Sequence, residues 1–379
     1  MANRVEIAIC GAGPVGMAAA LMLAQGGVAP ADIALIDAKS LGQAISDPRS
    51  IAISYGSRML LEGIGAWPLP ATAIHQIHVS RRGQFGRTMI EREAQQVPAL
   101  GYVTRYGDLV NALSVACERA GIAPLRPVKV TACDEREDGV SLQLDDGGTL
   151  DAALVAQAEG GLFGEQQARA RQHDYGQSAV IARVAASAPI AHRAYERFTN
   201  EGPLALLPQE GADGLQYALV WCVRPEHAQA LLAVDDAAFL AQLGAAFGTR
   251  LGSFTRCSSR IAYPLGLNAE PRATARTVAI GNAAQTLHPV AGQGLNLGLR
   301  DAAVLARLLA KGMTPEQLAK FADARTLDRK LTVNLTDAMA RVFAGTGPLQ
   351  ALLGLSLGVL DAVAPARSLL ADAMMYGRR

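Results

Sequence analysis

Residues 5–16 read VEIAICGAGPVG, an apolar run that leads directly into a glycine-rich turn. The apolar residues predict a buried strand, and Gly11, Gly13 and Gly16 have the spacing G-x-G-x-x-G. A helix is expected next, over residues 18–24, which are mostly alanine and leucine. Glycines at this spacing permit a tight turn, a close approach of the backbone to a pyrophosphate, and close packing of the helix on the strand. The segment therefore predicts a dinucleotide-binding unit.

A second apolar strand, residues 33–36, ends at Asp37. In dinucleotide-binding units an acidic residue about 20 positions after the glycines accepts hydrogen bonds from a ribose. Glycine spacing by itself is a weak signal that an ordinary structural turn would also satisfy. The strand, the helix, the second strand and the acidic end occur here together, and this combination favours dinucleotide binding.

A second glycine-rich connection, residues 281–296, reads GNAAQTLHPVAGQGLN. It follows the apolar run 277–280, which predicts a buried strand, and the spacing of apolar residues after it predicts a helix that begins near Leu295 or Asn296. Where a strand passes into a helix, backbone N–H groups and the positive end of the helix dipole can face an anionic group. The chain therefore offers two segments to one anionic cofactor.

Strand and helix signals alternate between these two segments. The main expected elements are a helix over residues 108–117 with Asp108 as its N-cap, a hairpin at 140–156, strands at 178–184 and 216–223, and a helix at 236–247. This order predicts an α/β fold in which a Rossmann-like domain is interrupted by a mostly antiparallel sheet.

Composition sets outer bounds on function. A chain of 379 residues, half of them apolar, is long enough for two domains or one elaborated domain, and a net charge of +1 provides no field that would attract nucleic acid. The five cysteines are scattered without a C-x-x-C pair, so neither a disulfide framework nor a zinc site is indicated. No apolar signal segment precedes the first strand. These features predict a reduced, cytoplasmic protein.

One stretch near the carboxyl end, residues 342–360, carries no charge. Its glycines and its proline argue against a membrane-spanning helix. Its leucines recur on roughly one helical face, which is the pattern of a helix packed in a core or lying in a membrane interface. Both interpretations stay open, and core packing is the simpler one.

Four segments, taken in order, make the chain resemble the flavoprotein aromatic hydroxylases, and within them the ubiquinone-biosynthesis hydroxylases. These segments are GAGPVG at 11–16, DPRSIAIS at 47–54, GPLALLP at 202–208, and residues 281–301. Many relatives carry Asp and His at the positions of Asn282 and Gln285. The Asn and Gln found here make the chain most similar to the hydroxylases of the 2-polyprenyl-6-methoxyphenol intermediate. The resemblance covers nearly the whole chain. It implies a Rossmann-like FAD-binding domain interleaved with a mostly antiparallel substrate sheet and followed by C-terminal helices.

The resemblance also implies domain boundaries. The expected FAD-binding domain comprises residues 1–72, 101–172 and 264–335, the expected substrate domain comprises 73–100 and 173–263, and a helical segment covers 336–379.

By resemblance, Gly11, Gly13 and Gly16 bind the FAD pyrophosphate and Asp37 holds the adenosine ribose. Arg49 is expected to reach the flavin, although it could instead anchor its own loop by pairing with Asp47. The other cofactor-binding residues that the resemblance implies are Arg105, Glu159, Asn282, Pro289, Gly292, Gln293, Gly294, Leu295 and Asn296. Glu159 replaces the Asp of many relatives, so its contact with a cofactor is expected to shift.

The implied activity is hydroxylation of the aromatic ring of a polyprenylated methoxyphenol through a flavin C4a-hydroperoxide, with O2 as co-substrate and NAD(P)H as a transient electron donor. A separate reductase could replace NAD(P)H, because the chain has no second G-x-G-x-x-G segment. No metal and no catalytic triad are expected. His288, beside the flavin loop, is a weak candidate for a proton shuttle, and a structural role is the simpler interpretation.

The implied substrate resides in the membrane, so a cytoplasmic enzyme at the membrane surface or in a quinone-biosynthesis assembly is expected. The alternatives are a flavin-dependent reductase or dehydrogenase of a hydrophobic isoprenoid, and a non-catalytic hydroxylase-like subunit. A halogenase is disfavoured, since no Trp-x-Trp-x-Ile-Pro segment occurs. Ring position, tail length, electron donor and oligomeric state stay open at this point.

Overall fold

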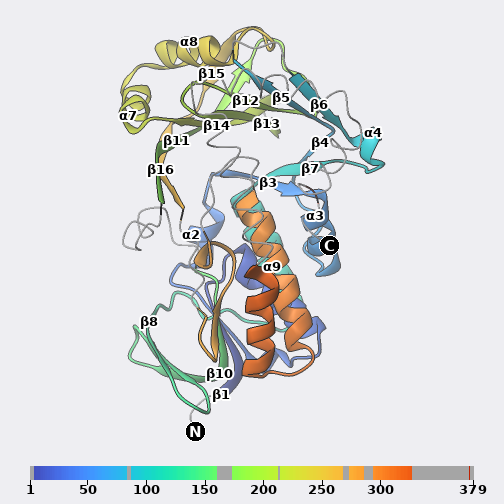
Figure 1. Ribbon diagram of the computed structural model, residues 1–379, viewed down its shortest axis with the longest axis vertical. Coiled ribbons are helices and arrows are strands. Elements are labelled where there is room, and N and C mark those ends of the chain that lie inside the picture. Colours follow the sequence, from blue (N-terminus) through green and yellow to red (C-terminus); the bar gives the residue numbers. More distant parts are fainter. Residues whose placement is uncertain are drawn as a thin grey trace.

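The computed structural model describes residues 4–82, 87–159, 173–211, 214–267, 273–285, 293–326 and Met375. Figure 1 shows two main regions, a six-stranded sheet with helices beside it and an eight-stranded sheet covered on its far side by two helices. A three-stranded sheet lies between them. The expected fold class, a Rossmann-like unit interleaved with a second sheet, is therefore confirmed.

The six-stranded sheet contains the first glycine segment. Its strands are β1 (Arg4–Cys10), β2 (Ile33–Ile36), β8 (Val130–Glu135), β9 (Val140–Leu144), β10 (Thr149–Gln157) and β17 (Thr277–Ala279). Strands β2, β1, β10 and β17 pair in parallel, whereas β9 and β8 continue from β10 as an antiparallel meander. The hairpin and return strand expected at 140–156 are confirmed.

Three helices cover one face of this sheet: α1 (Pro14–Gln25), α5 (Tyr106–Arg119) and α9 (Gln293–Leu309). Side chains alternate along β1, so Ile7 and Ile9 pack against the helices, while Ala8 and Cys10 on the other face pack with Val140 and Leu142 of β9. Parallel strands covered by helices place the strand ends, and the turns that follow them, at one edge of the sheet.

The eight-stranded sheet is mostly antiparallel, as expected. Its strands are β5 (Gln76–Arg81), β6 (Arg87–Glu91), β11 (His173–Ala186), β12 (Arg193–Phe198), β13 (Pro203–Gly211), β14 (Gly214–Val223), β15 (Phe254–Cys257) and β16 (Ile261–Leu267). Only the pairing of β12 with β5 is parallel among the pairs of this sheet that the described residues form. Helices α7 (Pro225–Ala233) and α8 (Asp236–Phe247) cover one face, where Tyr195, Tyr217 and Trp221 form the core with Phe239 and Phe247.

The three-stranded sheet joins the two regions. It consists of β3 (Ser50–Ser54), β7 (Gly101–Arg105) and β4 (Thr72–Ile74). The chain passes from β4 into β5 of the larger sheet, and from β7 into α5 of the other region. The remaining short elements are η1 (Pro30–Asp32), α2 (Leu41–Ile45), α3 (Tyr55–Gly63), α4 (Arg92–Gln95) and η2 (Gly281–Ala283).

Two expected helix boundaries are wrong, and one is correct. Helix α5 has Arg105 as its N-cap, so Asp108 lies in the first turn, where its carboxylate faces the positive end of the helix dipole instead of capping it. Helix α9 begins at Gln293, ahead of the expected start at Leu295 or Asn296. Helix α8 spans the expected residues, because the Asp235 carboxylate caps it by accepting a hydrogen bond from the Ala238 N–H at 2.7 Å.

No helix within the described residues is long and apolar enough to cross a bilayer. The uncharged run 342–360 lies outside the described residues, so both interpretations of it stay open. All five cysteines are free thiols.

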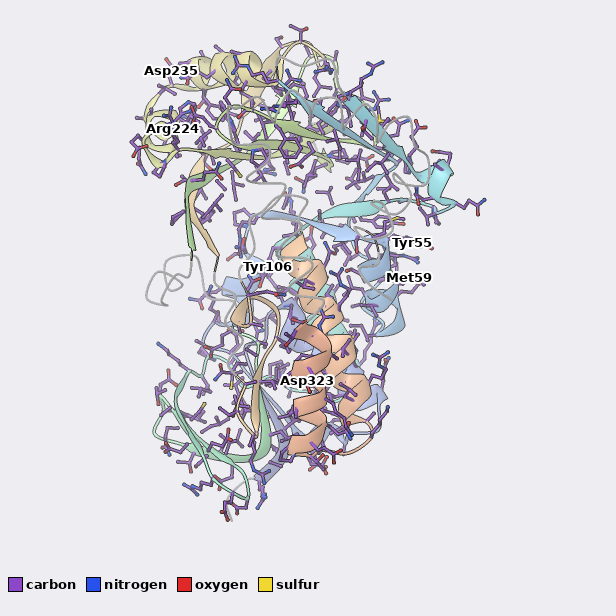
Figure 2. All side chains as sticks on the ribbon, viewed as in Figure 1. Tyr55, Met59, Tyr106, Arg224, Asp235 and Asp323 are labelled. Atoms are coloured by element: carbon purple, nitrogen blue, oxygen red, sulfur yellow. The ribbon has the colours of Figure 1, made fainter. Side chains whose placement is uncertain are left out.

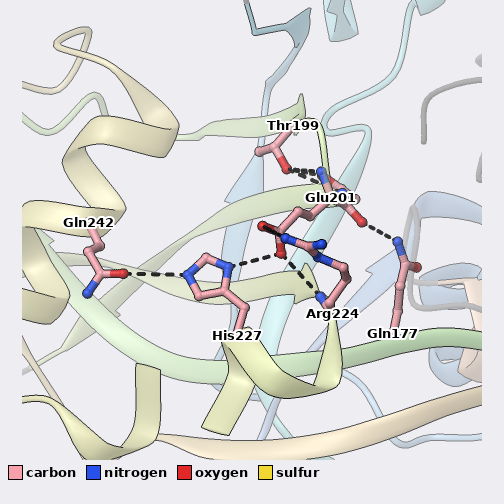
Figure 3. A network of polar contacts seen from close by, with 7 residues as sticks. Gln177, Thr199, Glu201, Arg224, His227 and Gln242 are labelled. Carbon is pink, nitrogen blue, oxygen red and sulfur yellow. Dashed lines mark hydrogen bonds and ion pairs between the residues drawn. The ribbon is translucent and has the colours of Figure 1, made fainter. Parts of the chain in front are cut away.

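A polar network fastens α7 and α8 to the turn between β12 and β13 (Figure 3). The Glu201 carboxylate lies 2.9 Å from His227 Nδ1 and accepts a hydrogen bond from the Arg224 backbone N–H at 3.2 Å, while His227 Nε2 lies 3.5 Å from Gln242 Oε1. Gln177 donates to the Glu201 carbonyl from the other side. Burial alone would raise the pKa of Glu201, but the hydrogen bonds with His227 and Arg224 outweigh it and lower that pKa.

We expect Glu201→Gln to destabilise the protein by about 1 kcal/mol at pH 7, because the charged partner of His227 is removed. A carboxyl whose pKa is lower in the folded state than in the unfolded state stabilises the fold at pH values above its unfolded pKa. This contribution disappears as the pH falls through the pKa of the folded state. The difference should therefore shrink below about pH 4. Urea unfolding of the wild type and the variant at pH 7 and at pH 3 gives the difference in unfolding free energy at each pH. The substitution Glu210→Gln, at an exposed glutamate, is the control. An equal difference at the two pH values would contradict this account.

Candidate functional site

The first glycine turn has the close contacts that its spacing predicts. Gly11 has a φ of +110°, and a Cβ there would lie 2.7 Å from the Glu159 backbone nitrogen, while a Cβ on Gly16 would lie 1.8 Å from the Gly11 carbonyl oxygen. Gly13 caps α1 without any side-chain hydrogen bond. The first N–H groups of α1 are therefore left for an anionic group.

Asp37 is tied to this turn. Its Oδ2 accepts a hydrogen bond from the Ala12 N–H at 2.7 Å, and its Oδ1 accepts one from the Lys39 N–H at 2.8 Å. The carboxylate thus links the end of β2 to the glycine turn and lies where a ribose-binding acid is expected.

Arg126 is a residue of this site that no sequence motif indicated. Its Nη2 lies 3.8 Å from Asp37 Oδ2 and donates to the Ala12 carbonyl. Its side chain is 7% exposed, and its Nε and Nη1 are buried without a hydrogen-bond partner. Buried donors without partners are rare in proteins, so a missing acceptor at this end of the site fits the geometry.

Arg49 adopts the loop-anchoring arrangement considered as an alternative. Its Nε lies 2.9 Å from Asp47 Oδ1 and its Nη2 lies 2.7 Å from Asp47 Oδ2, which is a bidentate pair. Burial alone would raise the pKa of Asp47, but the Arg49 guanidinium outweighs it and holds that pKa below its ordinary value. The guanidinium also lies over the Tyr106 ring, 5.0 Å from its centroid. Figure 2 shows Tyr106 between the two larger sheets. Contact between Arg49 and a flavin stays a prediction.

Arg105 and Glu159 are exposed where strands end. Arg105 ends β7 and precedes α5, and Glu159 follows β10 so closely that its backbone forms one wall of the Gly11 turn. The structure therefore brings Glu159 to the glycine turn through its backbone, and it leaves both side chains accessible.

The second glycine segment packs directly on the first. Gly281 has a φ of +59°, and the Val15 side chain fits against it and against Gly298 of α9. A Cβ on Gly298 would lie only 2.6 Å from a Val15 methyl group, and one on Gly281 would lie 3.2 Å from it. The amino ends of α1 and α9 are thereby held in one region of the molecule.

Asn282 and Gln285 differ in their surroundings. Asn282 is exposed, and its Oδ1 would lie 3.6 Å from a Cβ on Gly294, so these two expected residues are close together. Gln285 is 3% exposed, and neither atom of its amide has a hydrogen-bond partner. Gln293, Gly294 and Leu295 form the start of α9, whereas His288, Pro289 and Gly292 lie outside the described residues.

Asn296 fastens α9 to β3. Its Oδ1 accepts a hydrogen bond from the Ser54 N–H at 2.8 Å, and its Nδ2 donates to the Ala52 carbonyl at 3.1 Å. Asn296 was expected among the cofactor-binding residues, and both polar atoms of its side chain are hydrogen-bonded to the edge of β3. Any contact of Asn296 with a flavin stays a prediction.

A buried ion pair supports the whole second segment. Asp301 is 0% exposed, its Oδ2 accepts a hydrogen bond from the Gly281 N–H at 3.0 Å, and its Oδ1 accepts one from Arg325 Nε at 2.6 Å. Sequence reasoning assigned no role to either residue, because they lie on separate helical segments and form no motif. Their pairing fixes the turn after β17 against α9.

These observations test whether the site fits a dinucleotide. Two uncapped or glycine-rich helix starts adjoin each other, an acid lies at the end of β2, and buried donors of Arg126 lack an acceptor. A group with a pyrophosphate, a ribose and a second ring system satisfies all three features.

We expect Asp301→Asn to destabilise the protein by roughly 3 kcal/mol, because it leaves the buried Arg325 charge unpaired. Asp323→Asn is the matched control, since Asp323 is exposed on the same helical stretch as Arg325 and is visible in Figure 2. Urea unfolding followed by circular dichroism gives the unfolding midpoint of each variant. Equal midpoints for the two variants would show that the ion pair does not support the fold.

Comparison with known proteins agrees with this geometry. Residues 4–334 match the family described as FAD binding domain. Ubiquinone hydroxylase UbiL of Rhodospirillum rubrum is 33% identical over 96% of this chain and 88% of its own length. The 3-demethoxyubiquinol 3-hydroxylase of Escherichia coli is 33% identical over 82% of this chain and 81% of its own.

A likeness to solved structures supports the fold. The p-nitrophenol 4-monooxygenase PnpA of Pseudomonas putida superposes with a TM-score of 0.77 over 100% of both chains at 17% identity. This chain therefore belongs to the FAD-dependent aromatic hydroxylases, and its relatives within them are ubiquinone hydroxylases.

Proposed function

We propose that this protein hydroxylates the aromatic ring of a polyprenylated phenol in ubiquinone biosynthesis, with FAD as cofactor, O2 as co-substrate and NAD(P)H as electron donor. Relatives named for ubiquinone hydroxylation match 96% and 82% of the chain. The observation that carries the proposal is the direct attachment of the FAD-binding region to one face of the substrate sheet. Ser50 of β3 donates a hydrogen bond to Gln209 of β13 at 2.8 Å.

The chain's own residues would hold and orient the cofactor. Gly11, Gly13 and Gly16 leave room for the pyrophosphate at the start of α1, and Asp37 accepts from the adenosine ribose. Asn282 and the start of α9 would hold the flavin end of the cofactor. FAD, when bound, would accept electrons from NAD(P)H and use them to activate O2. The positive end of the α9 dipole would stabilise negative charge on a flavin bound there.

The substrate's long tail also bears on where the enzyme works. A polyprenylated phenol partitions into a bilayer, so we propose that the protein reaches its substrate from the cytoplasmic side of a membrane surface, alone or in a biosynthetic assembly. The uncharged run 342–360 supports this proposal, because an apolar segment could contact lipid or the substrate's tail.

We expect Asn282→Ala to weaken FAD binding about fivefold to tenfold, since one hydrogen bond worth about 1 kcal/mol would be lost. Asn282 is exposed at η2, so the fold should tolerate the change. Asn200→Ala is the matched control, because Asn200 is an exposed asparagine in the substrate sheet region. Quenching of FAD fluorescence on titration gives the dissociation constants. An unchanged constant for Asn282→Ala would remove this residue from the cofactor site.

The reaction itself is tested with the FAD-loaded protein, NADPH or NADH, and a 2-methoxyphenol that carries one isoprene unit, under 18O2. We expect one labelled oxygen atom to enter the aromatic ring, and mass spectrometry of the product locates the carbon. Oxygen-independent turnover of an isoprenoid would show a reductase or dehydrogenase instead. Failure to bind FAD would support the non-catalytic subunit.

A further inference from the structure

Cationic side chains gather on the face of the substrate sheet that α8 covers. Tyr195 marks this face, because its ring packs on Phe247 of α8 with the ring centroids 5.3 Å apart. His78 of β5 is the register partner of Tyr195, so its side chain lies on the same face. Figure 1 shows α8 on the far side of the sheet from β3 and α9, and the sheet therefore separates this face from the FAD-binding region.

Arginines occupy the rows on both sides of the row that His78 and Tyr195 form. Strand residues two positions apart share a face, so these neighbouring rows point the same way. One more arginine follows α8, and its charge acts on both His78 and Tyr195. The cation cluster is made of Arg87 of β6, Arg193 and Arg197 of β12, and Arg250, with His78 among them.

None of these four arginines forms an ion pair with a carboxylate in the described part of the chain. Arg193 donates from Nε to Gln76 Oε1 at 2.8 Å, and Arg197 donates from Nε to a backbone carbonyl of α8 at 3.1 Å. The exposed guanidinium groups of Arg87 and Arg250 have no partner among the described residues. Like charges without a counterion repel one another, and a bound anion would relieve that repulsion.

The acidic residues of the neighbouring strands do not supply this anion. Glu91 of β6 shares the face of the cluster, and its carboxylate accepts a hydrogen bond from Gln76 Nε2 at 2.9 Å. Glu196 lies next to Tyr195 on β12, so alternation turns it to the opposite face of the sheet. The charge of the cluster is therefore left for a group from outside the chain.

His78 lies inside the cluster without a hydrogen bond. It is 4% exposed, and both nitrogens of its ring are buried and have no partner. Burial first, and then the charges of Arg250, Arg87 and Arg193, lower the pKa of His78 to about 4. The ring is neutral at pH 7 and has one unused N–H donor.

The Tyr195 hydroxyl is a second buried donor without a partner. Tyr195 is 2% exposed, its ring centroid lies 5.6 Å from that of His78, and its hydroxyl forms no hydrogen bond with a described residue. Burial raises the pKa of Tyr195, and the charges of Arg193 and Arg250 oppose that rise. Buried donors without acceptors are costly, so two of them beside unpaired arginines call for a ligand that accepts hydrogen bonds.

We propose that this cluster binds a phosphate group, with Arg193 and Arg250 supplying positive charge and His78 and Tyr195 supplying the buried donors. A phosphate has more acceptor oxygens than a carboxylate, and guanidinium groups match its geometry. The two buried donors belong to neighbouring rings, which suits a compact group better than an extended acidic surface. The inference does not rest on the proposed function, because the site lies on the other face of the sheet.

Calorimetric titration of the FAD-loaded protein with inorganic phosphate tests the site while FAD occupies its own pyrophosphate site. Arg250→Gln should weaken phosphate binding about tenfold or more, because a charged donor is lost. Arg136→Gln is the matched control, since Arg136 is an exposed arginine after β8 in the other sheet region. Titration with chloride at equal ionic strength gives the background from charge screening.

Tyr195→Phe separates a ligand-binding role from a structural one. The variant removes a buried hydroxyl that has no partner, so it should melt no lower than the wild type and yet bind phosphate about fivefold more weakly. Tyr217→Phe is the matched control, because the Tyr217 hydroxyl accepts from the Ile190 N–H at 2.9 Å and donates to the Ile190 carbonyl at 3.0 Å. This control should melt at a lower temperature and bind phosphate as the wild type does.

A soluble phosphate ester and a phospholipid headgroup would present the same chemistry, and two further probes distinguish them. Glycerol 3-phosphate represents the soluble source, and phosphatidylcholine vesicles with and without phosphatidic acid represent the membrane source. Binding of the phosphatidic acid vesicles by the wild type but not by Arg250→Gln would identify a headgroup. Binding of glycerol 3-phosphate without binding of vesicles would identify a soluble ester.

Three results would overturn the proposal. The first is that the wild type shows no saturable phosphate binding beyond the chloride background. The second is that Arg250→Gln and Tyr195→Phe bind phosphate as tightly as the wild type, which would place the phosphate elsewhere. The third is binding of polyglutamate without binding of phosphate, which would identify the cluster as a docking surface for an acidic protein.

Discussion

The buried Asp301 carboxylate is the contact on which the arrangement of the site depends. It joins the Gly281 turn, helix α9 and Arg325, three parts of the chain that no strand pairing connects. Its enclosure makes both charges costly to leave unpaired, so the turn and the helix have one stable relative position. Val15 fits into the resulting surface of Gly281 and Gly298, and through it the two glycine segments become one cofactor cradle.

From that cradle a short series of contacts reaches the substrate sheet. Asn296 at the start of α9 is hydrogen-bonded to the edge of β3, and Ser50 on β3 is hydrogen-bonded to Gln209 on β13. The FAD-binding region and the substrate sheet are therefore oriented by specific polar contacts.

Local rules were sufficient for much of the fold and part of the site. The glycines at 11, 13 and 16 require close backbone contacts that only glycine permits, and the structure has them. The Asp235 cap and the apolar spacing after it define α8 completely. The prediction that Asp108 is the N-cap of α5 was wrong. Where a strand runs directly into a helix, the sequence does not distinguish an acidic residue at the N-cap from one in the first turn. Arg49 pairs with Asp47, which only the side-chain positions could show, and contact of Arg49 with a flavin stays a prediction.

The sequence alone therefore determined the dinucleotide-binding unit and the interleaved antiparallel sheet, because these depend on residues adjacent in the chain and on their period. The family followed from the resemblance that four segments carry. Tertiary structure decided what depends on distant pairs. Arg126 reaches the Asp37 corner only when β2 and the segment before β8 come together, and Asp301 finds Arg325 only after two helices pack.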